Sequence, residues 1–290
     1  MRYLSAWELR RCLPMELAIQ AMEQAFGDDI EIPPRTLLGV SLFMAGRVGA
    51  FTGVKVVSTV AGDPAGMVVA FGGDGHPIGV VDGPALTAIR TAAGAGLATR
   101  LLARDDARVM AMLGAGTMAF DQVEAVRAVR HIDEVLVWSR TLGHARRLAE
   151  RVGGEAVEST AAAVHRADVI TTATPARQPL FPPEALQPGA HLNAIGAFTP
   201  EMAEIPPQVV RRARVVVDDR QAAAAEAGDL LQAHRPPDLI MGDLLAGRAP
   251  GREASEQVTL FKSVGIASQD VAAAVAALGR AEEIGAGQVL

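Results

Sequence analysis

A glycine-rich turn in the middle of the chain has the pattern of a dinucleotide-binding site. The apolar stretch Arg108–Leu113 ends in Gly114-Ala-Gly116-Thr-Met-Ala119 and passes into a helical pattern. Gly114 permits a tight turn, Gly116 lets backbone N–H groups approach a pyrophosphate, and Ala119 keeps the helix close to its strand. The phosphate is expected at the positive end of a helix starting near Thr117. Glycine-rich turns are common in α/β proteins, but here both flanking patterns fit a dinucleotide.

The end of the next predicted strand indicates which dinucleotide is bound. An enzyme restricted to NAD usually has an acidic residue about 20 residues after the glycines, where it binds the ribose 2′-OH. This chain has Ser139, Arg140 and Thr141 there, and a hydroxyl with a guanidinium suits a 2′-phosphate. The sequence therefore favours NADPH over NADH, unless Arg140 is only a solvated residue at a helix start. The predicted cofactor-binding residues are Gly114, Gly116, Thr117, Met118, Ser139, Arg140, Thr141, Thr174 and Ile195.

Three cationic side chains are candidates for binding and proton transfer. Lys55 and Lys262 are the only lysines among 27 basic residues, and Lys55 lies within an apolar strand pattern. Burial in a cleft would lower its pKa and suit it to proton transfer, although a lysine there can also line a dimer interface or prevent pairing at a sheet edge. Arg90 lies in a helix of small residues and could hold a carboxylate bidentately, or could simply face solvent. Arg35, after two prolines, is a weaker candidate of the same kind.

The sequence offers no metal site and no nucleophile motif. No HxxxH pattern or His/Asp/Glu cluster indicates a metal, and the one cysteine, Cys12, excludes an internal disulfide framework. His191 lies on a buried-looking strand, where we expect a hydrogen-bonded core histidine. A net charge of −6 and 4% aromatic residues argue against nucleic-acid or anionic-membrane partners. The N-terminus lacks a signal-peptide pattern and no run is long enough to span a membrane, so we expect a cytoplasmic protein.

The hydrophobic pattern predicts two domains. From Arg108, strands alternate with helices as in a Rossmann-type doubly wound parallel sheet. We expect strands at 108–113, 134–139, 155–157, 168–173, 190–195, 214–218 and 258–263, with helices at about 117–129, 141–152, 160–165, 206–212, 221–233 and 242–247. The predicted dinucleotide-binding domain spans residues 106–265.

The remainder of the chain predicts a second domain of the α+β class. Two short helices within residues 5–26 precede strands at 37–40, 48–58, 67–71 and 77–81, and a small-residue helix follows at 85–103. The closing helix, about 267–284, is long enough to return to this domain. Residues 1–105 and 266–290 are therefore predicted to form one substrate-binding and dimerisation domain.

Several segments resemble the ornithine cyclodeaminase/μ-crystallin family. In order they are Lys55, Asp82-Gly-Pro-Ala-Leu-Thr-Ala-Ile-Arg90-Thr-Ala-Ala, Gly114-Ala-Gly, Asn193-Ala-Ile-Gly196 and Phe261-Lys-Ser-Val-Gly265. The resemblance covers roughly residues 30–285, and Leu-Thr-x-x-Arg-Thr-Ala-Ala is its most specific part. It implies a homodimer in which the first domain supplies the subunit interface and the substrate site. It also implies that Arg35 and Arg90 hold the substrate carboxylate, that Lys55 serves in binding and proton transfer, and that Ser263 and Val264 lie near nicotinamide and substrate.

One position departs from the family's pattern. Ornithine cyclodeaminases and related alanine dehydrogenases carry an aspartate two residues after Asn-Ala-(Ile/Val)-Gly, where this chain has Phe198. An apolar ring cannot act as a general base. The segment Gly196–Met202 instead resembles ketimine reductases acting on Δ1-pyrroline-2-carboxylate and Δ1-piperideine-2-carboxylate, with Phe198 as an apolar wall for the ring. The resemblance thus implies NAD(P)H-dependent reduction of a cyclic imino acid to L-proline or L-pipecolate.

Two other functions stay open at this point. An amino-acid dehydrogenase or cyclodeaminase of the same family could use Glu201 or Asp218 as its acid–base residue, and it would release ammonia. A non-catalytic NADPH-dependent binder of small molecules would bind the dinucleotide without turning over any imine.

Overall fold

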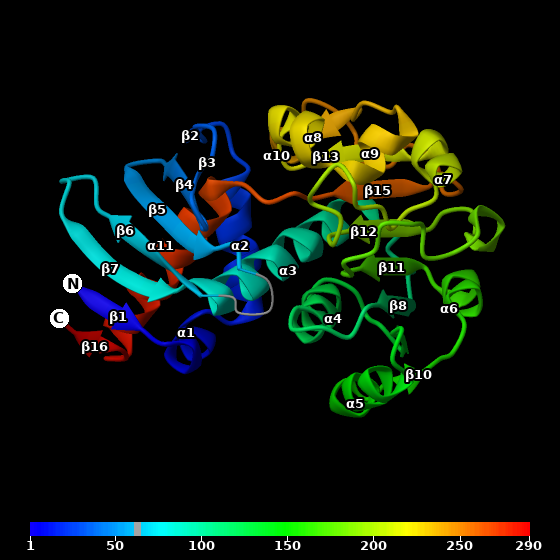
Figure 1. Cartoon of the computed structure of the whole chain (residues 1–290), viewed down its shortest axis with the longest axis horizontal. Coiled ribbons are helices and arrows are strands. Elements are labelled where there is room, and N and C mark those ends of the chain that lie inside the picture. Colours follow the sequence, from blue (N-terminus) through cyan, green and yellow to red (C-terminus); the bar gives the residue numbers. More distant parts are fainter. Residues whose placement is uncertain (61–64) are drawn as a thin grey trace. The chain divides into compact units, whose positions relative to one another are not determined.

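A computed structural model describes residues 1–60 and 65–290 of the chain, and these form two compact units. Unit 1 contains residues 1–94 and 265–290, and unit 2 contains residues 95–264 (Figure 1). The first boundary lies inside the helix α3 (Gly83–Leu102), whereas the sequence placed it in the loop after this helix. None of the described residues forms a helix that is long and apolar enough to cross a membrane.

Unit 2 is built on an eight-stranded sheet in which every neighbouring pair is parallel. The strands are β8 (Val109–Leu113), β9 (Glu134–Trp138), β10 (Glu155–Ala156), β11 (Val169–Thr172), β12 (His191–Ala194), β13 (Arg214–Val217), β14 (Leu239–Ile240) and β15 (Thr259–Lys262). Their order is β10-β9-β8-β11-β12-β15-β13-β14. The chain leaves β8 first toward β9 and later toward β11, so the direction of winding reverses between β8 and β11. This confirms the predicted α/β class with a doubly wound sheet.

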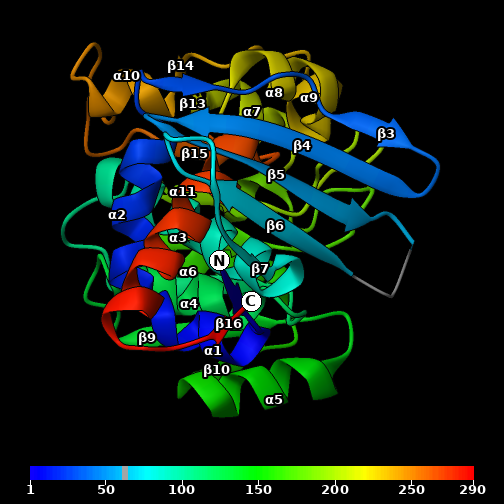
Figure 2. The same ribbon diagram turned by 90° about the vertical axis from the view of Figure 1, so that its left-hand side faces the viewer.

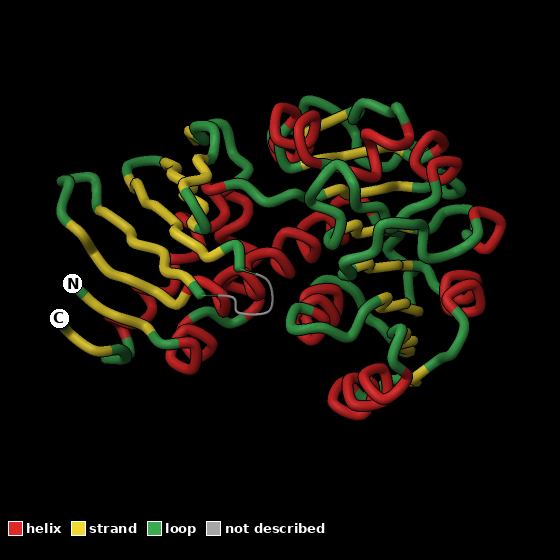
Figure 3. Tube along the Cα trace, viewed as in Figure 1, coloured by secondary structure: helices red, strands yellow, loops and turns green. Residues whose placement is uncertain are grey.

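Helices cover both faces of this sheet, and Figure 3 shows the row of strands with helices on either side. Met110 and Met112 of β8 belong to one buried cluster, whereas Ala111 and Leu113 belong to the other, because successive strand residues point to opposite faces. The helices are α4 (Ala119–Arg127), α5 (Leu142–Val152), α6 (Thr160–Arg166), α7 (Pro207–Arg212), α8 (Arg220–Glu226), α9 (Gly228–Ala233), α10 (Met241–Leu245) and the 3₁₀ turn η1 (Pro183–Ala185).

Two predicted helices of unit 2 differ in extent. The single helix expected at 221–233 is wrong, because the backbone leaves the helical conformation at Ala227 (ψ 81°) and separates α8 from α9. The helix expected near Thr117 begins at Ala119, after a turn over residues 116–118.

Unit 1 contains a second, mostly antiparallel sheet of order β16-β1-β7-β6-β5-β4-β2, with β3 paired to β4. Only the β1–β7 pair is parallel among its described strands. The strands are β1 (Arg2–Leu4), β2 (Ile30–Glu31), β3 (Thr36–Leu38), β4 (Ser41–Val48), β5 (Phe51–Ser58), β6 (Gly66–Phe71), β7 (Pro77–Asp82) and β16 (Gln288–Val289). The strand expected over 48–58 is wrong at its start, because Gly49 takes a left-handed conformation (φ 55°) and turns β4 into β5.

Besides the first part of α3, three described helices lie within unit 1: α1 (Ala6–Cys12), α2 (Met15–Ala25) and α11 (Ala267–Glu283). Helix α11 crosses one face of strands β4 to β7 (Figure 2). The sheet carries Gly46 and Gly53 beneath it, and a Cβ at either position would come within 3.0 Å of Ala267 or Val271. These glycines let the helix approach the sheet closely enough to bring its first turn against β5.

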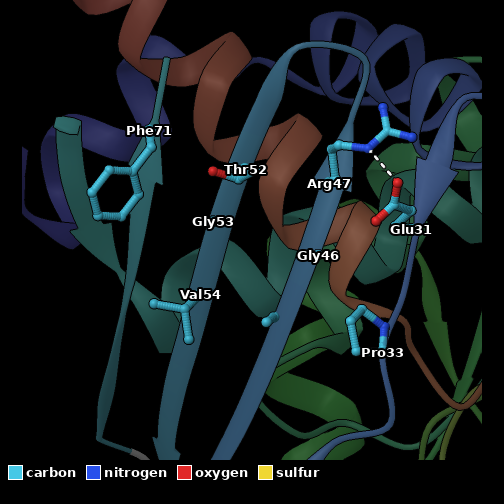
Figure 4. A pocket seen from close by; sticks show the side chains of 9 residues that line it. Glu31, Pro33, Gly46, Arg47, Thr52, Gly53, Val54 and Phe71 are labelled. Atoms are coloured by element: carbon cyan, nitrogen blue, oxygen red, sulfur yellow. Dashed lines mark hydrogen bonds and ion pairs between the residues drawn. The ribbon is translucent and has the colours of Figure 1, made fainter. Parts of the chain in front are cut away.

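The opposite face of this sheet is open. Its side chains alternate with the buried ones and are exposed or half-buried; they include Phe43, Ala45, Val54, Val56, Met67, Val69 and Phe71. A hollow of about 310 Å³ lies on the strands of this sheet. Its lining includes Arg47, Val54 and Phe71 (Figure 4). Glu31 accepts a hydrogen bond from Arg47 at its rim.

Candidate functional site

Unit 1 gathers a cluster of buried charges where β5, α3 and α11 meet. Lys55 on β5 and Arg90 on α3 both contact one carboxylate, that of Asp270 in the first turn of α11. The distances to Asp270 Oδ1 are 3.2 Å from Lys55 Nζ and 3.0 Å from Arg90 Nε. All three residues are at least 95% buried. Arg90 Nη1 also donates to Gln269 Oε1 at 2.9 Å, so the first turn of α11 holds two edges of the guanidinium.

Arg35 joins this cluster through the backbone that enters α11. Its Nη2 donates to the carbonyl oxygen of Gly265 at 2.7 Å. The Arg90 guanidinium lies against the same glycine, where a Cβ would be 2.8 Å from Nη1, and Gly265 has a φ of 79°. A side chain at this position would displace the guanidinium and strain the backbone. The predicted candidates Arg35, Lys55 and Arg90 are thus brought together within one unit.

Two buried cations of the cluster share one carboxylate. Lys55 and Arg90 share the Asp270 carboxylate, and Arg35 lies beside them on the Gly265 carbonyl oxygen. Burial lowers the pKa of Lys55 to about 8, aided by the positive charges of Arg90 and Arg35 and opposed by attraction to Asp270. A buried site with this balance suits an anionic ligand, and its amine can lose a proton near neutral pH.

Asp270 and Gln269 are functional candidates that the sequence analysis missed. Each lies more than two hundred residues from Lys55 in the chain, and the sequence around them reads as an ordinary helix start. The usable signal is the position: an acidic residue in the first turn of the closing helix, directly after Phe261–Gly265.

In unit 2, the turn after β8 has the shape that the glycine pattern predicts. Gly114 has a φ of 122°, and a Cβ there would be 2.5 Å from the carbonyl oxygen of Ala173. Gly116 is exposed, and a Cβ there would meet nothing within 4 Å, so its backbone faces open space in front of α4. Thr117 is exposed and Met118 is the residue before the first turn of α4. The turn fits a dinucleotide pyrophosphate, which would lie against the N-terminal amides of α4.

The end of β9 presents the other predicted cofactor contacts. Ser139 is half-buried, whereas Arg140 and Thr141 are exposed. They connect β9 to the N-terminus of α5. An exposed cationic side chain at the carboxyl end of this strand suits a ribose 2′-phosphate.

A buried carboxylate that the sequence analysis missed ties together the loops after β11 and β12. Glu204 is fully buried, and its two oxygens accept hydrogen bonds from the Thr174 amide and hydroxyl, the Gly196 amide and the Thr172 hydroxyl, at 2.7–2.9 Å. Burial raises the pKa of Glu204, although Lys262 lowers it. Of the predicted cofactor contacts, Thr174 is therefore held directly by this carboxylate, and the buried Ile195 precedes Gly196, which it also holds.

Lys262, the second lysine, is fully buried at the end of β15 and is paired internally. Its Nζ lies 3.2 Å from Asp229 Oδ2 and donates to the Ala194 carbonyl oxygen at 3.1 Å. His191 is also buried, and its ring nitrogens contact Thr259 Oγ1 and Asn193 Oδ1. Burial lowers the pKa of His191 to about 3. His191 is therefore the hydrogen-bonded core histidine that the sequence predicts.

The remaining predicted substrate contacts belong to unit 2. Ser263 Oγ and the Val264 amide both donate to Asp218 Oδ2 at 2.9 Å, so Asp218 fixes the segment that follows β15. Phe198 is 54% exposed on the loop after β12. Glu201 is exposed on the same loop. Among the described residues, no group of three potential ligands could hold a metal ion.

Fold and site together define a two-unit protein with a dinucleotide-type α/β sheet and a buried cationic cluster. A family model for the ornithine cyclodeaminase/mu-crystallin family matches residues 42–284. The chain belongs to this family, as its sequence motifs indicated.

Individual relatives are similar over most of the chain. A Δ1-pyrroline-2-carboxylate reductase of Bacillus cereus is 38% identical over 228 residues, which cover 74% of this chain and 70% of the relative. The solved structure of the Thermococcus litoralis Δ1-pyrroline-2-carboxylate reductase, in complex with NADH and L-proline, covers 100% of both chains with a TM-score of 0.93 and 29% identity. An archaeal alanine dehydrogenase dimer with bound NAD covers 99% of this chain and 98% of its own, with a TM-score of 0.92 and 28% identity.

Proposed function

We propose that this protein is an NAD(P)H-dependent reductase of cyclic ketimine carboxylates, converting Δ1-pyrroline-2-carboxylate or Δ1-piperideine-2-carboxylate to L-proline or L-pipecolate. The buried cluster of Lys55, Arg90 and Asp270, with the half-buried Arg35 beside it, carries this proposal, because two cations share one carboxylate and the amine has a pKa of about 8. The similarity to two Δ1-pyrroline-2-carboxylate reductases supports the same substrate class.

In this proposal each side chain of the cluster has one task. Arg35 and Arg90 bind the substrate carboxylate, for which a guanidinium offers paired N–H donors. The Lys55 ammonium has three N–H donors, and Asp270 is its one hydrogen-bond partner among the described residues. Its remaining donors can reach the imine nitrogen, to which the charged amine delivers a proton.

We infer that the turn after β8 binds the reduced dinucleotide. When bound, the nicotinamide supplies the hydride that the imine carbon needs, so no water has to be activated. Gly114, Gly116, Thr117 and Met118 form the pyrophosphate turn, and Thr174 and Ile195 belong to the loops at the neighbouring strand ends. The preferred dinucleotide is NADPH, with NADH as the second choice, because of Ser139, Arg140 and Thr141.

The proposed substrate contacts also include Ser263, Val264 and the apolar ring of Phe198.

The first experiment compares the two cyclic imines and the two reduced dinucleotides. The purified protein is mixed with Δ1-pyrroline-2-carboxylate or Δ1-piperideine-2-carboxylate, and oxidation of NADPH or NADH is followed by absorbance. We expect rapid oxidation with at least one imine, and L-proline or L-pipecolate as product. Tight dinucleotide binding without oxidation of either cofactor by any imine would contradict the proposal and favour a non-catalytic binder.

An amino-acid dehydrogenase is the second candidate, because the archaeal alanine dehydrogenase is similar over nearly the whole chain. The Asp218 carboxylate is engaged by Ser263 and Val264, which argues against it as the acid–base residue of that reaction. Ammonia release from L-alanine or L-ornithine with NAD(P)⁺ would favour the second candidate.

Phe198→Asp is expected to weaken cyclic-imine reduction, and an unchanged kcat/KM would remove Phe198 from the substrate site.

We further propose that the protein forms a homodimer through the open face of the unit 1 sheet. This face exposes a continuous set of apolar side chains, including Met67 at 56% exposure, and such patches mark interaction surfaces. Val69→Asp, near the centre of the face, is expected to give monomers in light scattering. Val289→Asp, which changes an exposed residue of the edge strand β16, is the matched control. A wild-type monomer at micromolar concentration would contradict the proposal.

A further inference from the structure

The Asp270 carboxylate occupies an unusual place between two cations. One of its oxygens, Oδ1, contacts both Lys55 Nζ and Arg90 Nε, at 3.2 and 3.0 Å. The other oxygen, Oδ2, is buried and has no hydrogen-bond partner among the described residues. A carboxylate is seldom buried this completely with half of its acceptors unused, so its contact with the two cations calls for a specific role.

We propose that Asp270 is the positioning residue of this cluster: its carboxylate keeps the Lys55 amine charged and fixes Arg90 beside it. The proposal rests on the function proposed above, in which Lys55 donates a proton and Arg90 binds a carboxylate. Asp270 itself touches neither substrate nor cofactor in this view, because it is 99% buried behind the two cations.

The charges around Lys55 explain why a carboxylate is needed. Burial and the neighbouring Arg90 and Arg35 all favour the neutral amine, and Asp270 is the group that favours the charged form. The first-turn position of Asp270 in α11 places its side chain near the positive end of a 17-residue helix, where an acidic residue is favourable. Without this carboxylate, Lys55 would be neutral over much of the pH range in which it must donate a proton.

The geometry also explains the arrangement of Arg90. Asp270 Oδ1 accepts a hydrogen bond from Arg90 Nε, and Gln269 Oε1 accepts one from Arg90 Nη1. The guanidinium also lies against Gly265. Two consecutive residues of one helical turn therefore fix the guanidinium at two points. Both cations are positioned by the same turn, so their separation is set within unit 1 before any ligand arrives.

The presence of only two lysines allows a direct test without an activity assay. Protein labelled with ¹³C at the lysine ε-carbons gives two signals, which Lys55→Arg assigns. We expect the Lys55 signal of the wild type to titrate with a midpoint near 8. In Asp270→Asn, which keeps the shape and removes the charge, the midpoint is expected to fall by about 1–3 pH units. The Lys262 signal is expected to be the same in both proteins.

Asp229→Asn is the matched control, because it removes the carboxylate from the other buried lysine pair at the same 3.2 Å distance. It is expected to change the Lys262 signal and to leave the Lys55 midpoint where it is. If Asp270→Asn does not fold, Asp270→Ser, which leaves room for water beside the cations, is titrated in the same way. A Lys55 midpoint that is unchanged or raised in the Asp270 variant would overturn the proposal.

Turnover of the cyclic imine, measured on the same samples, separates this inference from the proposed function. A shifted midpoint together with a high-pH limit of kcat/KM shifted by the same amount supports both. If the Lys55 midpoint shifts in the Asp270 variant but the wild type reduces no imine, the role of Asp270 is supported and the proposed reaction is refuted. Normal turnover with an unshifted midpoint refutes the role of Asp270 alone.

Discussion

The pH dependence of cyclic-imine reduction gives the sharpest test of Lys55 as proton donor. Burial lowers the pKa of its amine to about 8, and only the charged form can donate a proton. As pH rises through this value, kcat/KM should fall tenfold per pH unit. Between pH 7 and pH 10 the charged fraction drops from about nine-tenths to about one-hundredth, a decrease of roughly ninety-fold. A lysine with an ordinary pKa would lose less than about half of its charge over the same range.

Lys55→Arg is the matched perturbation, because a guanidinium keeps the positive charge and does not lose it in this pH range. We expect the kcat/KM of this variant to be about a hundred-fold lower, in line with the loss of a general acid. Its kcat/KM should also lack the fall that begins near pH 8 in the wild type. Dinucleotide oxidation is followed in both proteins at each pH. The ratio of their kcat/KM values cancels the titration of the imine itself. A wild-type profile that stays flat to pH 10, or the same limb in both proteins, would refute the assignment.

Four further substitutions address the proposed dinucleotide site and the core. Arg140→Gln should lower the kcat/KM ratio of NADPH to NADH about tenfold to a hundred-fold, and an unchanged ratio would remove Arg140 from the cofactor site. Gly114→Ala should lower the unfolding free energy in urea by at least about 2 kcal/mol, since its Cβ would meet the Ala173 carbonyl oxygen at 2.5 Å. Gly116→Ala, with open space around its Cβ, should instead raise the KM for the dinucleotide and leave the unfolding free energy nearly unchanged. His191 has a pKa of about 3 in the folded protein and takes up a proton near pH 6.5 only when the chain is unfolded. The unfolding free energy should therefore fall by the order of 4 kcal/mol between pH 6.5 and 3. In acid-unfolding measurements, His191→Gln should make the unfolding free energy depend less on pH.

The parts of this protein that sequence patterns predicted are those with local causes. The turn at Gly114 follows from neighbouring residues, because a strand, a left-handed glycine and a helix start occur within about a dozen positions. The parallel sheet follows from the alternation of short apolar runs with helical patterns. The strands β1 and β16, at one end of the unit 1 sheet, were not predicted, since each is short and acquires its conformation by pairing with a distant partner.

The candidate site divides in the same way. Lys55 and Arg90 stand out because a cation in an apolar pattern is conspicuous by itself. Asp270 and Glu204 do not stand out, because an acidic residue at a helix start or in a loop has an ordinary solvated alternative. Only the fold brings Asp270 to Lys55 across 215 residues of chain, or places the Glu204 carboxylate between the loops of two parallel strands.

The way unit 1 is assembled from both ends of the sequence has a consequence for protein synthesis. Lys55 and Arg90 leave the ribosome long before Asp270, and the whole of unit 2 is translated in between. Until α11 emerges, the strands β4 to β7 lack the helix that covers them. Lys55 and Arg90 likewise lack the Asp270 carboxylate that neutralises part of their charge. Unit 2, whose residues are contiguous, can complete its fold earlier. A nascent chain should therefore gain dinucleotide binding first and the cationic cluster last, with the sheet of unit 1 exposed to chaperones in the meantime.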